Sequence, residues 1–172
     1  MNSFKIGERI IYPNQGLAVI EDIQEELLYG ERFQIYRVRI LSNNTLVMVP
    51  SANTEEIGIR RPIAEDSVKE IFRFLKKHEV EVCSDWKGRY KEHVSLMRSG
   101  TIFDMACVLK GLYFLSLTKP LSFREKKMLE KAKELLIAEI SEVSDLSLDK
   151  IEQRLADTLS LCAKTFKQNL EI

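Results

Sequence analysis

One short segment, Asp85-Trp86-Lys87-Gly88-Arg89-Tyr90-Lys91, combines residue types that could bind nucleic acid. It contains the only tryptophan of the 172-residue chain. The cations in and after it are Lys87, Arg89, Lys91 and Arg98. Only Glu92 opposes them over residues 86–99, so the local charge is four minus one, or +3, in a chain whose formal net charge is zero. Cations that hold phosphates beside an exposed ring that presses against bases are typical of nucleic-acid binding.

The residue types alone leave two interpretations of this segment open. Trp86 is either an exposed contact or a core tryptophan near Val82, Cys83 and Tyr90, with cations whose stems cover it while their charges stay in water. We expect Lys110, on the next helix of the chain, to join the basic patch of the first interpretation.

A second candidate surface lies in the first third of the chain, where Arg37 and Arg39 alternate with apolar residues. On the next expected strand, Val47 and Val49 alternate with Leu46 and Met48, so one of these pairs faces outward. An apolar residue exposed among arginines suggests a protein interface. The alternative is that Met48 fills the core.

Catalytic and metal-binding patterns are missing from the sequence. The two histidines, His78 and His93, have no Cys, Asp or Glu at metal-ligand spacing. The three cysteines are an odd number without a C-x-x-C pair, which argues against a disulfide framework or a zinc site. No phosphate-binding glycine loop or nucleophile motif occurs. We therefore expect no cofactor, no metal and no enzyme activity; the rival is an enzyme whose site has no recognisable motif.

Composition places the chain among globular proteins. Hydrophobic residues make up 45% and charged residues 30%. No apolar run approaches the roughly 18 residues that span a bilayer, and the first ten residues lack a signal-peptide pattern. We expect a monomeric cytoplasmic protein with no membrane contact.

Residues 4–60 have the texture of a β domain. The patterns predict strands at 9–12, 17–28, 34–41 and 45–49, and a short fifth strand at 57–60. Pro50 ends the fourth strand because it cannot donate to a ladder. Five short strands with tight turns predict a Tudor/SH3-like β-barrel over residues 1–61.

Residues 62–172 have the texture of a helical bundle. We expect helices at 65–77, 85–98, 102–117, 123–143 and 148–167. Thr101 and Ser122 are the predicted N-caps of the third and fourth helices, and Ser122 with Glu125 has the spacing of a capping box. The predicted fold is therefore α+β in two domains: a five-stranded barrel, then a compact bundle of about five helices.

Four blocks of sequence carry a family resemblance. They are Phe4-Lys5-Ile6-Gly7-Glu8 with Ile11-Tyr12-Pro13-Asn14-Gln15-Gly16, Val49-Pro50 with Gly58-Ile59-Arg60, Asp85-Trp86-Lys87-Gly88-Arg89-Tyr90, and Leu121-Ser122-Phe123-Arg124-Glu125-Lys126-Lys127-Met128-Leu129 with Ala132. In this order they resemble the CarD/CdnL family of bacterial transcription factors. The barrel is also similar to the polymerase-interacting module of the transcription-repair coupling factor.

The resemblance implies a function for both domains. The barrel would bind the β subunit of RNA polymerase, and the helical domain would contact promoter DNA at the upstream edge of the melted bubble. Trp86 would wedge into the minor groove and stabilise the open complex, with the protein held at the nucleoid through polymerase. Arg89 and Lys91 match positions that contact the DNA backbone, and the positions that match the polymerase interface are Val38, Met48 and Pro50.

Three positions depart from residues that family members use. Gly88 stands where a basic residue is common, and Leu115 and Glu26 each replace an arginine of some members. We therefore expect weak DNA affinity for the isolated protein, with polymerase supplying most of the attachment. An alternative function is an adaptor that binds polymerase or another protein without touching DNA.

Overall fold

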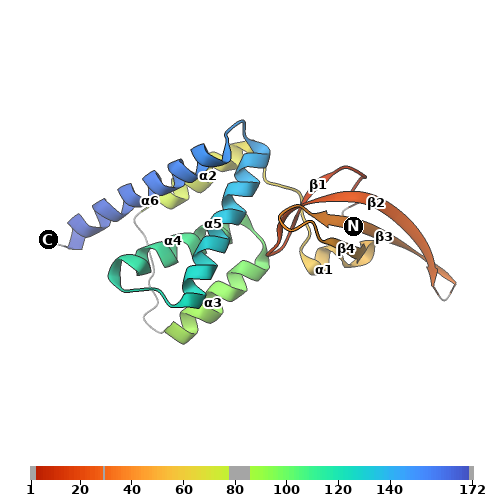
Figure 1. Ribbon diagram of the computed structural model, residues 1–172, viewed down its shortest axis with the longest axis horizontal. Helices are drawn as coiled ribbons and strands as arrows, with labels where there is room; N and C mark the ends of the chain where they lie inside the picture. Colours follow the sequence, from red (N-terminus) through yellow and green to blue (C-terminus); the bar gives the residue numbers. More distant parts are fainter. Residues whose placement is uncertain (1–2, 29, 78–85, 171–172) are drawn as a thin grey trace. The chain divides into compact units, whose positions relative to one another are not determined.

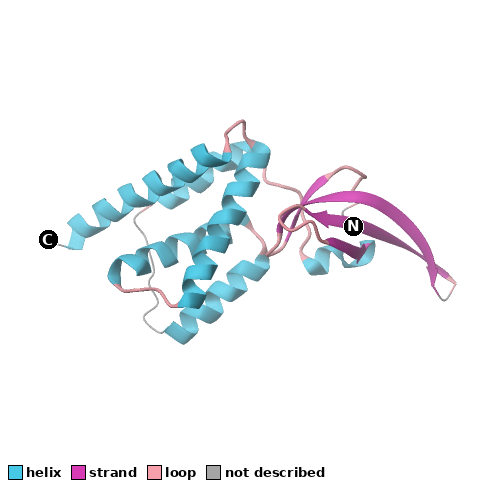
Figure 2. Cartoon of the chain, in the orientation of Figure 1, coloured by secondary structure: helices cyan, strands magenta, loops and turns pink. Residues whose placement is uncertain are grey.

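The structure is a computed structural model that describes residues 3–28, 30–77 and 86–170. The chain divides into two compact units, Met1–Pro62 and Ile63–Ile172 (Figure 1). Strands belong to the first unit, whereas the second is built from helices (Figure 2). Each unit has a hydrophobic core of its own.

The first unit contains a four-stranded antiparallel sheet in the order β1-β2-β3-β4. Its strands are β1 (Arg9–Tyr12), β2 (Gly16–Leu28), β3 (Glu31–Ile40) and β4 (Leu46–Pro50). Strict alternation on β3 turns apolar side chains to one face of the sheet. They join a core made of Phe4, Ile10, Ala18, Ile20, Tyr36, Val38, Ile40, Val49 and Ile59.

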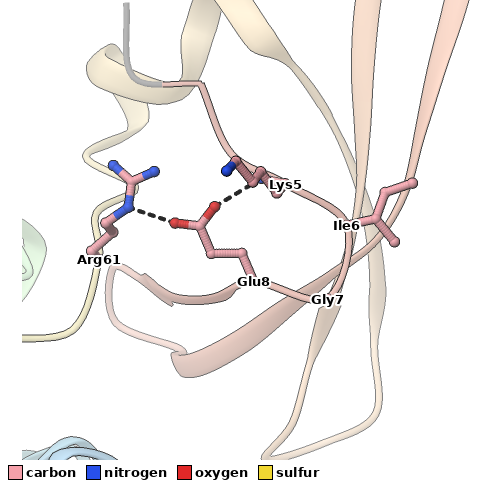
Figure 3. A pocket seen from close by; sticks show the side chains of 5 residues that line it. All are labelled: Lys5, Ile6, Gly7, Glu8 and Arg61. Carbon is pink, nitrogen blue, oxygen red and sulfur yellow. Dashed lines mark hydrogen bonds and ion pairs between the residues drawn. The ribbon is translucent and has the colours of Figure 1, made fainter.

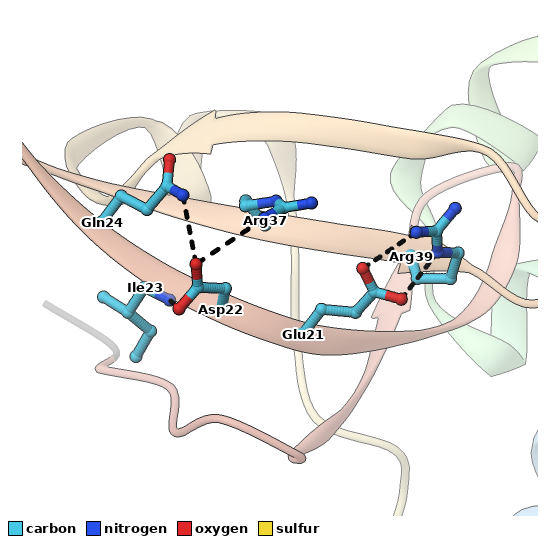
Figure 4. Close-up of polar contacts among 6 residues, drawn as sticks. All are labelled: Glu21, Asp22, Ile23, Gln24, Arg37 and Arg39. Atoms are coloured by element: carbon cyan, nitrogen blue, oxygen red, sulfur yellow. Dashed lines mark hydrogen bonds and ion pairs between the residues drawn. The ribbon is translucent and has the colours of Figure 1, made fainter.

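A β-bulge interrupts the pairing of β2 with β3. Ile20 lies opposite Val38, but the next paired residue is Asp22, opposite Arg37, so Glu21 is an extra residue on β2. A bulge re-aims side chains because two residues of one strand oppose one residue of the other. As a result, the consecutive residues Glu21 and Asp22 both extend toward the arginines of β3 (Figure 4).

The predicted fifth strand is wrong. A short 3-10 turn, η1 (Ser51–Asn53), leads into a one-turn helix, α1 (Thr54–Ile57), which takes up the start of the expected strand. Gly58 ends α1 with φ of 85°, a conformation that glycine adopts without strain. Only Arg60 then pairs, in an isolated bridge with Ile11 (N···O 2.7 and 3.2 Å). The described residues therefore form a four-stranded sheet, and the five-stranded barrel is not confirmed.

Arg61 ties the end of the first unit to its beginning (Figure 3). Its Nε lies 2.5 Å from Oε1 of Glu8, whose other oxygen accepts a bond of 2.8 Å from the backbone N–H of Lys5. The same guanidinium donates to the carbonyl of Ser3 (3.0 Å) and lies 5.1 Å from the ring centre of Phe4. Residues 3–8 and 60–61 therefore form one joined edge.

The second unit contains the five predicted helices, close to their expected bounds. They are α2 (Glu65–Lys76), α3 (Trp86–Ser99), α4 (Ile102–Thr118), α5 (Phe123–Val143) and α6 (Leu148–Leu170). Helix α4 packs against α2, α3, α5 and α6, which explains why it is apolar around most of its circumference. No helix within the described ranges is both long and apolar enough to cross a membrane.

Both predicted N-caps are confirmed. The Thr101 side chain accepts a bond from the backbone N–H of Asp104 (3.1 Å). Ser122 and Glu125 form a complete capping box, with bonds of 3.3 Å to the Ser122 hydroxyl and 2.9 Å to the Glu125 carboxylate. These bonds satisfy N–H groups that a helix start otherwise leaves open.

Candidate functional site

The outward face of the sheet exposes apolar side chains on β4. Met48 is 46% exposed and Leu46 37%, and Pro50 is also exposed. The register pairs Met48 with Arg37 and Leu46 with Arg39. This surface, which we call the sheet face (Arg37, Arg39, Leu46, Met48 and Pro50), thus has apolar residues between cations. Met48 is on the surface, so its alternative role as core filler is wrong.

The two arginines of the sheet face are paired with carboxylates. Arg39 donates to both oxygens of Glu21 (2.7 and 3.0 Å), and this hydrogen bonding lowers the pKa of Glu21 and raises that of Arg39. Nη1 of Arg37 lies 3.8 Å from Oδ2 of Asp22 (Figure 4). The bulge at Glu21 makes both pairs possible. The sheet face is therefore close to neutral, although its sequence is rich in arginine.

Val38 does not lie on the sheet face. It is fully buried in the core of the first unit, because its side chain points to the opposite side of β3 from Arg37 and Arg39. The family resemblance implied that Val38 contacts a partner. This expectation is corrected, because the Val38 side chain packs in the core of the first unit.

Helix α3 has a buried side and an exposed side. Arg89, His93 and Met97, four residues apart, are 5%, 8% and 6% exposed. Burial lowers the pKa of His93 below its ordinary value, although charged neighbours also act on it. Lys91 and Arg98, seven residues apart on another side of the helix, are exposed. These two cations are available to a ligand.

Trp86 and Lys87 are the first two residues of α3. Their side chains lie outside the part of the chain that the structure describes. The predictions that Trp86 is an exposed wedge and that Lys87 binds DNA therefore remain predictions.

Arg89 is a buried ion-pair partner and not a surface cation. Its Nη2 lies 3.2 Å from Oε1 of Glu125, and the two side chains are 6% and 7% exposed. Burial alone would raise the pKa of Glu125, but hydrogen bonds from Ser122 and Arg89 outweigh it and lower that pKa. In this arrangement Arg89 holds α3 against α5, which corrects the expectation that it contacts the DNA backbone.

Lys110 is also buried, at 3% exposure. Its Nζ donates to the carbonyls of Phe74 (3.2 Å) and Lys77 (2.5 Å) and lies 5.1 Å from the ring centre of Phe74. A cation at a helix C-terminus satisfies open carbonyls and suits the helix dipole. Lys110 therefore completes the end of α2 and is not part of a basic surface, contrary to expectation.

The first turn of α5 carries cations that the residue-by-residue reasoning missed. Arg124, Lys126 and Lys127 are exposed, and Phe123 is 71% exposed with Nζ of Lys127 4.6 Å from its ring centre. The Arg89–Glu125 pair joins this turn to the start of α3. The capping box is the feature of the sequence that could have revealed this group. It assigns the Glu125 carboxylate to the start of the helix and leaves the three cations exposed. Lys91, Arg98, Arg124, Lys126 and Lys127 share positive charge and exposure, and we call this set of residues the basic surface.

The three departures from the family lie in different settings. Gly88 is exposed on α3, Glu26 is exposed on β2, and Leu115 is in the core of the second unit at 3% exposure. An arginine at 115 would need a different local packing, so Leu115 is a core residue in this chain.

No metal site is visible among the described residues, where no cluster of three or more His, Cys, Asp or Glu could hold an ion. A hollow in the first unit is lined by Lys5, Ile6, Gly7, Glu8 and Arg61 (Figure 3). The Glu8 carboxylate and the Arg61 guanidinium there already bond to each other and to the backbone. These charged groups of the hollow therefore stabilise the first unit, and we assign no ligand to the hollow.

Comparison with known proteins gives matches in both units. Residues 4–63 match the model of the CarD-like/TRCF RID domain, and residues 70–156 match that of the CarD C-terminal domain. A Bacillus subtilis (strain 168) protein named "Putative transcription factor YdeB" is 32% identical over 149 residues. That alignment covers 87% of this chain and 97% of the relative.

Proposed function

Because this chain belongs to the CarD family of transcription factors, we propose that it stabilises promoter open complexes of bacterial RNA polymerase. The first unit would dock on the polymerase β subunit, and the second would contact DNA at the upstream edge of the bubble. The observation that carries the proposal is that the two units differ in surface chemistry. The first unit has the near-neutral sheet face, and the second has the basic surface.

The sheet face suits a protein partner. Met48 and Leu46 offer apolar area, and the ion pairs of Arg37 and Arg39 fix polar groups around it. An apolar centre with a polar rim is the usual anatomy of a protein interface. β4 is also at the edge of the sheet, where a partner strand could add to it.

The basic surface suits the DNA backbone. Lys91 and Arg98 on α3, with Lys87 at its start, would contact phosphates, and Trp86 would act as the wedge. About three or four such contacts give weak and salt-sensitive binding. Docking of the first unit on polymerase raises the local DNA concentration to about the millimolar range, so weak contacts suffice.

The energy that the mechanism requires is small. A tenfold longer open-complex lifetime needs only about 1.4 kcal/mol. One aromatic ring that fills the gap between unstacked bases can supply that amount. We expect the protein to act as a cytoplasmic monomer, held at the nucleoid through polymerase, without catalysing a reaction.

The test is the lifetime of open complexes on a ribosomal-RNA-type promoter, challenged with competitor DNA. Wild-type protein should lengthen the lifetime, Trp86→Ala should not, and Lys91→Gln with Arg98→Gln should give an intermediate value. Lys69→Gln, which removes an exposed cation of α2, is the matched control and should behave as wild type. Equal lifetimes with wild type and Trp86→Ala would contradict the wedge.

A second candidate function is an adaptor that binds polymerase without DNA contact. The neutral, ion-paired sheet face favours it, since this surface needs no nucleic acid to bind a protein. The adaptor function would be supported if Trp86→Ala and the Lys91/Arg98 variant both bound polymerase and both preserved promoter activity.

A further inference from the structure

We propose that Arg89 and Glu125 are a positioning pair that fixes the first turn of α3, and with it the backbone of Trp86, for DNA contact. This inference rests on the proposed function. It assigns a role in DNA contact to Glu125, although an acidic side chain is repelled by DNA and would not be expected to contribute to binding.

The geometry of Glu125 links two helices rigidly. Its Oε2 accepts a bond from the backbone N–H of Ser122 (2.9 Å) and completes the capping box of α5. Its Oε1 faces Nη2 of Arg89 on α3 (3.2 Å). One carboxylate thus caps the start of α5 and holds α3, and both side chains are almost fully buried. A buried charge-assisted contact of this kind allows little movement between the turns that it joins.

Arg89 is well placed to control Trp86. It lies three residues after Trp86, which corresponds to about 4.5 Å along the helix axis. Within α3 it is the first side chain that the structure places in the interior, and His93 and Met97 continue the buried side. The Arg89–Glu125 pair is therefore an anchor near the start of α3, and its loss would remove this anchor from the turn that carries Trp86.

The sign of one substitution separates positioning from direct contact. Glu125→Gln removes a negative charge between the cations of α3 and α5, so electrostatic attraction alone predicts stronger DNA binding. Positioning predicts the opposite, because the anchor of α3 is lost. Gln can still serve at the N3 position of a capping box, so α5 keeps its start.

The experiment uses full-length protein and two readouts. Trp86 is the sole tryptophan, so acrylamide quenching of fluorescence in the free protein reports on it directly. Open-complex lifetime with polymerase reports on function. The variants are Arg89→Gln and Glu125→Gln. The matched controls are Lys91→Gln, an exposed cation of α3, and Glu130→Gln, an exposed acid of α5.

We expect both pair variants to change the quenching constant of Trp86 in the same direction, and to shorten the lifetime by roughly three- to tenfold. Glu130→Gln should match wild type in both readouts, and Lys91→Gln should shorten the lifetime with unchanged quenching. Circular dichroism checks folding. If Arg89→Gln fails to fold, Glu125→Gln alone decides, because it keeps the capping box.

The proposal is overturned if Glu125→Gln leaves the quenching constant equal to that of Glu130→Gln, or if it lengthens the lifetime. Failure of the proposed function gives a different result: Trp86→Ala would then leave the lifetime unchanged, while the quenching comparison would still decide whether the pair positions α3.

Discussion

The sheet face and α3 use arginine in opposite ways. On the sheet, Arg37 and Arg39 stay at the surface but are matched by Asp22 and Glu21, so their charges are largely cancelled. On α3, Arg89 is withdrawn into the interior with Glu125, whereas Lys91 and Arg98 remain exposed. The difference shows that residue type does not identify a binding cation. The partner and the burial of each cation decide whether its charge is available.

Arg89→Ala should have the largest effect, because it leaves the Glu125 carboxylate buried without its cation. We expect a loss of about 3–5 kcal/mol in the free energy of unfolding, the range for a broken buried pair. Urea denaturation followed by circular dichroism measures it. A loss as small as that of an exposed pair would show that Arg89 is hydrated, and the contrast between the two regions would disappear.

Lys110→Met should come next. It keeps the stem of the side chain but removes the donor for the carbonyls of Phe74 and Lys77. The Phe74 carbonyl still accepts from the N–H of Lys77 (3.2 Å) and the Lys77 carbonyl from the Cys162 thiol (3.3 Å), so the cost is that of losing hydrogen bonds from a charged donor. Such bonds contribute about 1–3 kcal/mol, so we expect the thermal unfolding temperature to fall accordingly. The control is Lys119→Met, an exposed lysine after α4. Equal stability of the two variants would place Lys110 at the surface, as the sequence suggested.

Met48→Ala should weaken polymerase binding about tenfold, or about 1.4 kcal/mol, with little change in folding stability. Met48 is exposed, so its truncation removes interface area but no core contact. Titration of labelled protein with polymerase measures the affinity. Leu27→Ala, which truncates another exposed apolar side chain of the first unit, is the control. Identical affinities would remove Met48 from the interface.

Acid pH should distinguish the two carboxylates whose pKa is lowered, Glu125 and Glu21. A lowered pKa means that the unfolded chain binds the proton more readily. The stabilisation by Glu125 is therefore present above about pH 4.5, its ordinary pKa, and is lost as pH falls through the lowered value. One proton accounts for at most about 1.4 kcal/mol per pH unit. Glu125→Gln should flatten the stability profile between pH 5 and 3 more than Glu21→Gln does. A reversed order would contradict the assigned burial.

The smallest effect should come from Glu21→Gln with Arg39→Gln. Glu21 is exposed and Arg39 is half-buried, so solvent reaches the pair and screens it, and the free energy of unfolding at neutral pH should not change measurably. Chemical denaturation at low and high salt is the measurement. A marked loss of stability would mean that the pair holds the bulge in place and is not merely accommodated by it.

The helices could be predicted because their signals are local. Thr101 and Ser122 each stand directly before the first residue of their helices, and apolar spacing indicates the rest of each helix. The fifth strand failed for the opposite reason. The pairing of Arg60 with Ile11 joins residues far apart in the sequence, and the alternation in 57–60 does not reveal that α1 takes up Ile57.

Exposure was predicted correctly where it follows from the usual behaviour of a residue, as for Lys91 and Arg98, whose binding roles stay predictions. It was mispredicted where tertiary structure overrides that behaviour. Charged residues are rarely buried unless paired. Arg89 and Lys110 each find partners 36 residues away, and no local pattern shows this. The bulge at Glu21 is equally hidden, since one extra residue breaks the alternation on β2 without a marker in the sequence.

The joined edge of the first unit has a consequence for how such a domain can be reused. Arg61 and Arg60 bind residues 3–11, so the entry and exit of the chain lie together and are closed by contacts within the unit. A fold closed in this way can be spliced between unrelated neighbours, because its boundary needs no help from them. The matching domain description covers residues 4–63 and is shared between CarD-like and TRCF proteins. The Glu8–Arg61 contact thus closes the boundary of a domain type that occurs in both kinds of protein.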